Sequence, residues 1–309
     1  MRARPAIRCT ALAAIALAAA PHLAMAAGDA PVKPQPAPAA STAPPAAAAP
    51  GDHGFFVGLD LVGGGLGGAK TRVRENADEG TTFRLPADLG IDFAGEARLR
   101  LGWRFDRDDA LVFSLTHIFL WGGTRLTGDV HYNGSTLQGG TRLESRPRFL
   151  SFELLYERAL FRWGADGRGA LALDVALRYD LLHWDFQATF APTSTGHEAA
   201  EDFDAQAMPV PLLGVTVRQP IASSLDLVAY GRAMRANHWD SFRTEGGTVY
   251  WSETCVEAGL AVAWRLNERV EIDFGYRFLF LDIGEKSKED GNFLVAQIHG
   301  VSAGITLFF

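Results

Sequence analysis

Large apolar residues alternate with polar or small residues along most of this chain, and the alternation persists over unusually long runs. In residues 270–283, for example, Phe274 and Tyr276 stand at even positions, whereas Asp273 and Arg277 stand at odd positions. Neighbouring residues of a β-strand point to opposite faces, so a period of two predicts strands with one apolar and one polar face. The pattern therefore predicts an all-β fold.

Ten such runs follow residue 53. They span approximately 54–63, 93–105, 110–121, 146–160, 169–184, 206–219, 225–239, 252–265, 270–283 and 294–309. Most of them hold 12 to 16 residues, whereas the strands of soluble proteins usually hold about five or six. A tilted strand needs about 9–11 residues to cross a bilayer. The run lengths thus favour strands that span a membrane.

The connections between the runs alternate in length. Those after the odd-numbered runs hold about 29, 24, 21, 12 and 10 residues, and those after the even-numbered runs hold about 4, 8, 5 and 4. Long surface loops that alternate with tight periplasmic turns are typical of outer-membrane barrels. We therefore expect a transmembrane antiparallel up-and-down β-barrel of ten strands, with eight or twelve strands as alternatives.

The seven tryptophans support this expectation, because each lies near an end of a predicted strand. Aromatic residues form girdles at the two interfaces of a membrane barrel. Trp103, Trp163 and Trp264 fall at the tight-turn ends, and Trp121, Trp184, Trp239 and Trp251 fall at or just beyond the long-loop ends. We expect all seven to belong to these girdles.

The first 26 residues have the features of a signal peptide. Three arginines precede a short apolar stretch, and Ala24, Met25 and Ala26 form a small-x-small cleavage site. Mean hydropathy over the chain is close to zero, and no later segment is long and apolar enough for a transmembrane helix. We expect residues 1–26 to direct export and to be removed.

Residues 27–53 are almost entirely Ala and Pro, a composition that buries no core and favours extended conformations. We expect a disordered periplasmic tail there, followed by the barrel in residues 54–309. The formal charge of −7 becomes −7 − 3 = −10 once the three arginines of the signal peptide are removed. This charge argues against nucleic acid as a partner. Cys255 is the single cysteine left, so no internal disulfide is expected.

The end of the chain, Gly304-Ile305-Thr306-Leu307-Phe308-Phe309, resembles the terminal strand of Gram-negative outer-membrane proteins. The stretch from Asp273 to Phe278, followed by His299, resembles the small OmpA-like and Omp25-type surface barrels. The resemblance implies location in the outer membrane and recognition by the barrel-assembly machinery. It also implies outer-membrane lipids and lipopolysaccharide as neighbours. Those small barrels usually have eight strands, whereas this sequence predicts ten.

Charged residues occupy the inward phase of many predicted strands. A ten-stranded barrel is only slightly wider than one that its own side chains fill, and unpaired buried charges are costly. We therefore expect a salt-bridged lumen network with nine acids and six bases. Its members are Asp60, Glu96, Arg98, Arg100, Arg104, Glu153, Glu157, Asp174, Arg178, Asp180, Asp226, Arg232, Glu257, Asp273 and Arg277.

A His-Trp-Asp motif ends two of the predicted strands, and two further acids precede the sixth. His and carboxylate groups can serve as acid/base residues or metal ligands. The rim candidates are His183, Asp185, Asp202, Asp204, His238 and Asp240. The omptins, ten-stranded surface proteases, place a His–Asp pair opposite an Asp pair, but here the third strand ends in Trp121-Gly122-Gly123 without acids. The simpler interpretation is a girdle tryptophan between polar rim residues.

Two features do not fit a regular barrel. Pro209 and Pro211 predict a bulge or an unpaired extension in the sixth strand, since proline donates no ladder hydrogen bond. His117 stands on the lipid-facing phase, which suggests a register change in the third strand.

The sequence predicts a barrel that displays surface loops in a structural or surface-binding role, with a largely filled lumen. A narrow channel for small solutes is the alternative, and an omptin-like rim hydrolase is a weaker one. The mature chain carries no phosphate-binding loop, dinucleotide fingerprint, zinc cluster or nucleophile elbow. We assign no catalytic residue, cofactor or metal site, and the sequence identifies no surface ligand.

Overall fold

The computed structural model describes residues 54–72, 82–132, 135–164, 166–189, 199–206, 209–240, 250–286 and 291–309. Within these ranges, the side chains of residues 131–137, 182–189, 199–206, 238 and 292 are not described. The predicted signal peptide and the Ala/Pro-rich tail lie outside the described residues.

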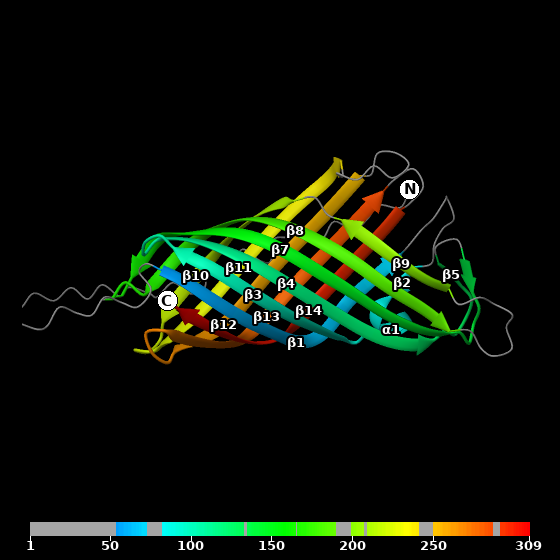
Figure 1. Ribbon diagram of the computed structural model, residues 1–309, viewed down its shortest axis with the longest axis horizontal. Helices are drawn as coiled ribbons and strands as arrows, with labels where there is room; N and C mark the ends of the chain where they lie inside the picture. The colour runs from blue at the N-terminus through cyan, green and yellow to red at the C-terminus, as the bar shows by residue number, and fades with distance from the viewer. Residues whose placement is uncertain are drawn as a thin grey trace, which may run out of the picture. The chain divides into compact units, whose positions relative to one another are not determined.

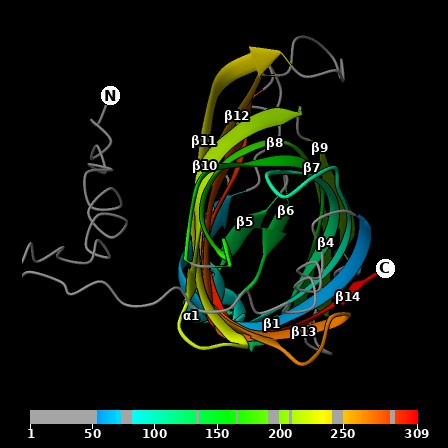
Figure 2. The ribbon, with the colours of Figure 1, turned by 90° about the vertical axis from the view of Figure 1, so that its left-hand side faces the viewer.

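Ten long antiparallel strands form a closed ring, with the sixth strand in two pieces, β9 and β10 (Figures 1 and 2). Pairing of β14 with β1 closes the ring, with Phe308 opposite Phe56. The predicted all-β, ten-stranded antiparallel barrel is therefore confirmed. The strands are β1 (Gly54–Arg72), β3 (Phe93–Arg104), β4 (Asp109–Arg125), β7 (Arg142–Trp163), β8 (Gly169–Thr189), β9 (Ala199–Gln206), β10 (Val210–Pro220), β11 (Leu225–Asp240), β12 (Tyr250–Arg265), β13 (Val270–Lys286) and β14 (Gly291–Phe308).

Four short elements lie in the long connections. The strand β2 (Phe83–Arg84) pairs with β1 and leads directly into the helix α1 (Leu85–Leu89). The strands β5 (Val130–Tyr132) and β6 (Ser135–Leu137) form a separate hairpin. In the part of the chain that the structure describes, no helix is long and apolar enough to cross a membrane.

Several strands extend further at the long-connection end than the sequence predicts. β1 continues to Arg72 instead of ending near residue 63, and Gly65 pairs both with Phe93 and with His299. The glycine-rich stretch of β1 resembles a loop in the sequence because glycine has no side chain to show the alternation. Backbone pairing nevertheless continues through it.

The sixth strand is interrupted, as its two prolines predict. Pro209 lies between β9 and β10, and Pro211 pairs with β8 alone. Pairing of β10 with β11 begins only at Leu213, opposite Ala233. Proline is tolerated there because no second neighbour requires its missing N–H.

The outward face of the ring is apolar over a broad belt. Leu61, Phe274 and Val301 are 54%, 59% and 67% exposed, and they lie at the outward positions of three neighbouring strands. A closed ring leaves no unpaired strand edge, and an apolar exterior matches hydrocarbon. The chain is a transmembrane β-barrel of the outer-membrane type.

His117 is part of this outward face. It pairs with Ala97 of β3 and Leu150 of β7 within regular ladders, and its ring packs against Phe119 at 5.8 Å. The register change expected at this residue is therefore wrong. A polar outward residue at this level requires no break in the strand.

An arginine on the outward face of β14 should destabilise the barrel according to its depth. Val301→Arg places a charge near the middle of the belt and should cost about 2–4 kcal/mol, whereas Leu307→Arg, near the tight-turn end, should cost about 0–1 kcal/mol. Urea unfolding in lipid vesicles, followed by heat-modifiable gel migration, measures both. Equal costs for the two variants would contradict the inward and outward assignment of β14.

Candidate functional site

The lumen is the candidate site, and its contents form two layers. The structure places all fifteen predicted network residues at inward positions, in the half nearer the tight turns and in the middle of the barrel. Inward residues nearer the long connections are mostly apolar. The lumen is thus mainly charged toward the tight turns and mainly apolar toward the long connections.

Glu257 on β12 is a centre of the charged layer. Its Oε1 accepts hydrogen bonds from Arg178 Nη1 at 2.5 Å and from Arg98 Nη2 at 3.4 Å. Arg178 Nε also donates to Asp180 Oδ1 at 2.8 Å, and Arg98 Nε donates to the hydroxyl of Thr116 at 3.0 Å. The side chains of Glu257 and Arg178 are each only 2% exposed. These ions are therefore compensated by one another and not by bulk water.

A second group of contacts joins strands across the ring. Arg277 Nη1 donates to Glu96 Oε1 at 2.6 Å, and Arg277 Nε donates to the hydroxyl of Tyr230 at 2.8 Å. Arg232 contacts Glu153 at 3.1 Å and Asp174 at 2.9 Å. Each arginine thus links strands that are not neighbours in the chain, which fixes the cross-section of the barrel.

The remaining predicted members lie nearer the tight turns. Arg100 Nη2 donates to Asp60 Oδ1 at 2.8 Å, and the Arg104 guanidinium lies over the Phe56 and Phe308 rings. A hollow of about 300 Å³ occupies this end, and its lining includes Glu157 and Asp273. The lining extends to residues of the tight turns, so the hollow reaches that end of the barrel.

Sequence reasoning missed one ion cluster beside this hollow. Arg218 on β10 contacts Asp226 at 2.9 Å and Glu271 at 3.0 Å. Arg265 lies 3.8 Å from Asp226. The predicted network omits Arg218, Arg265 and Glu271, although each stands on the inward phase of its strand. Counting back from the regular end of that strand would have placed Arg218 inward.

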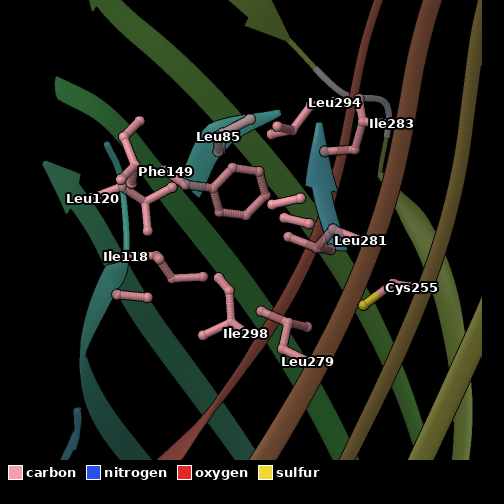
Figure 3. Packing of buried hydrophobic residues seen from close by; sticks show 14 of the residues in the cluster. Leu85, Ile118, Leu120, Phe149, Cys255, Leu279, Leu281, Ile283, Leu294 and Ile298 are labelled. Atoms are coloured by element: carbon pink, nitrogen blue, oxygen red, sulfur yellow. The ribbon is translucent and has the colours of Figure 1, made fainter. Parts of the chain in front are cut away.

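The apolar layer fills the other half of the lumen (Figure 3). Figure 3 shows Leu85 of α1 among Phe149, Ile283 and Leu294, which are inward residues of three different strands. Leu85 is completely buried. The described part of the connection between β1 and β3 therefore packs inside the lumen.

Local chemistry shapes this inserted connection. Pro86 lies in the first turn of α1, where its fixed φ suits a helix start. Arg84 donates side-chain hydrogen bonds to Asp88, which hold the pKa of that carboxyl below its ordinary value. Gly90 ends the helix in the left-handed region at φ 64°, and a Cβ there would lie 2.7 Å from the carbonyl oxygen of Gly123. Only glycine fits this turn.

The sequence does contain a signal for the apolar layer. Phe278, Leu279, Phe280 and Leu281 are apolar without interruption, so the alternation of β13 ends there. A strand that is apolar on both faces must be covered on both faces. The even residues face outward and the odd ones join the lumen cluster.

Trp251 also belongs to the lumen. It is 1% exposed, and its Nε1 donates to Glu253 Oε2 at 3.1 Å. The expectation that it lies in an aromatic girdle is wrong, because Trp251 shares the inward phase of β12 with Cys255 and Glu257. Cys255 is fully buried, and its Sγ accepts a hydrogen bond from Arg178 Nη1 at 3.5 Å. It therefore packs as a small side chain of the lumen.

The rim candidates are brought together only in part. Backbone register pairs His183 with Asp204 and Asp185 with Asp202 across β8 and β9. His183 also pairs with Arg148 of β7. This position lies on the outward register, because Asp180 is inward and buried. The four residues thus share an outward strip of backbone positions.

His238 and Asp240 lie on another strand, β11. Asp240 pairs with Tyr250 of β12, and the register shifts between Ala236 and Trp239, the interval that contains His238. Among the described residues, no pairing joins β11 to β9. The backbone therefore does not unite the two His-Trp-Asp motifs. Among the described side chains, no group of three His, Cys, Asp or Glu residues could hold a metal ion.

No protein-family model matches this chain, and no curated protein matches it. Among solved structures, the outer membrane protease OmpT from Escherichia coli is similar, with 9% identity over 82% of this chain and 97% of that chain and a TM-score of 0.44. The translocator domain of the autotransporter NalP from Neisseria meningitidis is 16% identical over 83% and 89%, with a TM-score of 0.36. Neisserial surface protein A is 11% identical over 82% and 97%, with a TM-score of 0.28. None of these similarities transfers an activity.

Removing the charge of Glu257 should destabilise the barrel strongly. Glu257→Gln leaves Arg98 and Arg178 without their shared carboxylate, and an uncompensated buried charge costs about 3–5 kcal/mol. The matched control is Asp88→Asn, because its partner Arg84 is 72% exposed and an exposed pair contributes only about 0–1 kcal/mol. Urea unfolding of refolded protein compares the two, and equal losses would mean that the lumen ions are solvated.

Proposed function

We propose that this protein is a closed outer-membrane barrel that displays its long connections at the cell surface, with the lumen acting as an internal brace. The observation that supports the proposal is that two packed layers fill the lumen, one above the other. An ion-paired layer joins opposite walls, and an apolar layer with α1 fills the space above it. Among the described side chains, Glu257, Arg178 and Asp180 of the ion-paired layer are almost completely buried.

The alternative, a narrow channel, has one point in its favour. The hollow at the tight-turn end is polar and holds about 300 Å³. It ends, however, against the buried groups around Glu257 and Arg178. Solutes entering the hollow would have to displace paired charges and then an apolar plug. The brace therefore agrees better with the packing than a channel does.

The proposed orientation places the tight turns and both ends of the barrel domain in the periplasm. Phe309 N donates to the carbonyl of Phe55 at 2.9 Å, so the C-terminus is held at the tight-turn end. Together with the terminal Gly304–Phe309 pattern, this supports barrel-assembly machinery as a partner during biogenesis. Lipopolysaccharide and other outer-membrane lipids would surround the belt. The proposal assigns no enzymatic role.

Conductance distinguishes the brace from the channel. Refolded protein inserted into planar bilayers should give no unitary current steps, because both layers of the lumen are packed. Heat-modifiable migration of the same sample verifies that the barrel is folded, and injection of detergent alone sets the background. Steady steps from folded protein would overturn the brace and favour the channel.

Cysteine labelling tests the orientation. The native Cys255 is buried and should not react. Gln138→Cys, in an exposed long connection, should react with an impermeant maleimide on intact cells. Ser223→Cys, in an exposed tight turn, should react only after the outer membrane is permeabilised. The reverse pattern would place the long connections in the periplasm.

A further inference from the structure

An outward notch interrupts the barrel wall at the long-connection end. β3 begins at Phe93, which pairs with Trp121 of β4. β4 continues to Arg125 and pairs there with Arg142 of β7. Because β3 is shorter than its neighbours, a hollow of about 1040 Å³ forms above Phe93. Its lining combines outward residues of β4 and β7 with the inward-phase Gly122 and Thr124 of β4, Phe93 at the start of β3, and the segment that follows α1.

The floor of the notch is aromatic. The rings of Phe93 and Trp121 lie 5.0 Å apart, and Trp121 stacks on Phe119 at 5.6 Å with an interplanar angle of 8°. Phe93 is 41% exposed and Trp121 is 50% exposed. Exposed aromatic residues near a strand end mark the level at which hydrocarbon meets headgroups.

The wall of the notch is basic. Arg125, Arg142 and Arg146 line it, together with the carboxylates of Asp92 and Glu144. Glu144 contacts Arg142 Nη2 at 3.2 Å and Arg146 Nη2 at 3.6 Å. These two arginine side chains remain 63% and 62% exposed. Glu144 therefore orients two guanidinium groups whose remaining donors are accessible from outside the barrel.

The charge of the notch favours an anion. Its described lining carries three guanidinium groups and two carboxylates. Guanidinium binds phosphate through paired, charge-assisted hydrogen bonds. Backbone register places Asp185 of β8 opposite Arg146, on the side of β7 away from β4. The notch opens on the β4 side, where Gly123 has no side chain to fill it. A Cβ added to Gly123 would come no closer than 3.4 Å to the atoms of any residue other than its chain neighbours.

We propose that this notch binds the phosphorylated headgroup of an outer-leaflet lipid. The phosphate pairs with Arg142 and Arg146, and the first carbons of the acyl chains pack on Phe93 and Trp121. The combination of groups carries the inference. Arg146 lies beside the aromatic floor, since its neighbour Ser145 pairs with Gly122, and Arg142 pairs with Arg125 three residues further toward the long connections. Free phosphate would use the arginines but not the aromatic floor. The leaflet assignment depends on the orientation proposed above.

Native mass spectrometry of the barrel refolded in micelles tests this site with diphosphoryl lipid A as the probe. Wild type should retain the lipid, and the double variant Arg142→Gln, Arg146→Gln should bind at least about ten-fold more weakly, because charge-assisted hydrogen bonds are lost. Gly123→Leu fills the notch without changing its charge and should also weaken binding. Arg235→Gln is the matched control, since Arg235 is an exposed outward arginine on β11 and binding should be unchanged.

Three results would overturn the proposal. One is undiminished binding by the folded double variant, and another is an equal loss in the Arg235→Gln control. The third is displacement of lipid A by inorganic phosphate at equal concentration, which would show that the lipid part contributes nothing. Heat-modifiable migration excludes misfolding in each variant. The micelle assay does not depend on conductance or orientation, so its failure is distinguishable from failure of the proposed function.

Discussion

Hydrocarbon offers no partner for a backbone N–H or C=O group, so every strand of this protein must be paired along both edges within the belt. The seam between β1 and β14 satisfies the last pair of edges, from Phe56 opposite Phe308 upward. Once the ring is closed, its strand number fixes how much space remains inside. Ten strands enclose a lumen slightly wider than the one that the side chains of an eight-stranded barrel fill. Both the paired charges and the apolar plug follow from this limit.

The two lumen layers solve different problems. Arginines reach across the ring to Glu257, Glu96 and Glu153, which holds opposite walls at a set distance. Such pairs are a weak source of net stability, because both ions lose their hydration. The apolar layer contributes the burial that favours folding, since Phe149, Ile283 and their neighbours are almost completely removed from water. The charged layer therefore sets the geometry, and the apolar layer stabilises it.

The plug and the outward notch are two consequences of one connection. After β1, the chain pairs briefly as β2, turns inward as α1 and stays in the lumen cluster through Ile91, which is completely buried. It joins the ring only at Phe93, several residues below the ends of β4 and β7. The segment that packs inside the lumen is thus unavailable to cover the outer side of β4. Because α1 lies inside the lumen at this level, the notch outside β4 stays uncovered.

The sequence by itself determined the strand number, the alternating connections and the inward phase of the regular strands. These features are local, because a period of two and a short turn can be recognised within one or two strands. Only the tertiary structure revealed the features that do not show in the alternation of apolar and polar residues. The glycines of β1 carry no alternation, so its upper half could not be recognised as a strand. The unbroken apolar run of β13 indicates that both of its faces are covered, but it does not indicate by which segment. That segment, α1, lies almost two hundred residues earlier in the chain, and only closure of the ring brings the two together.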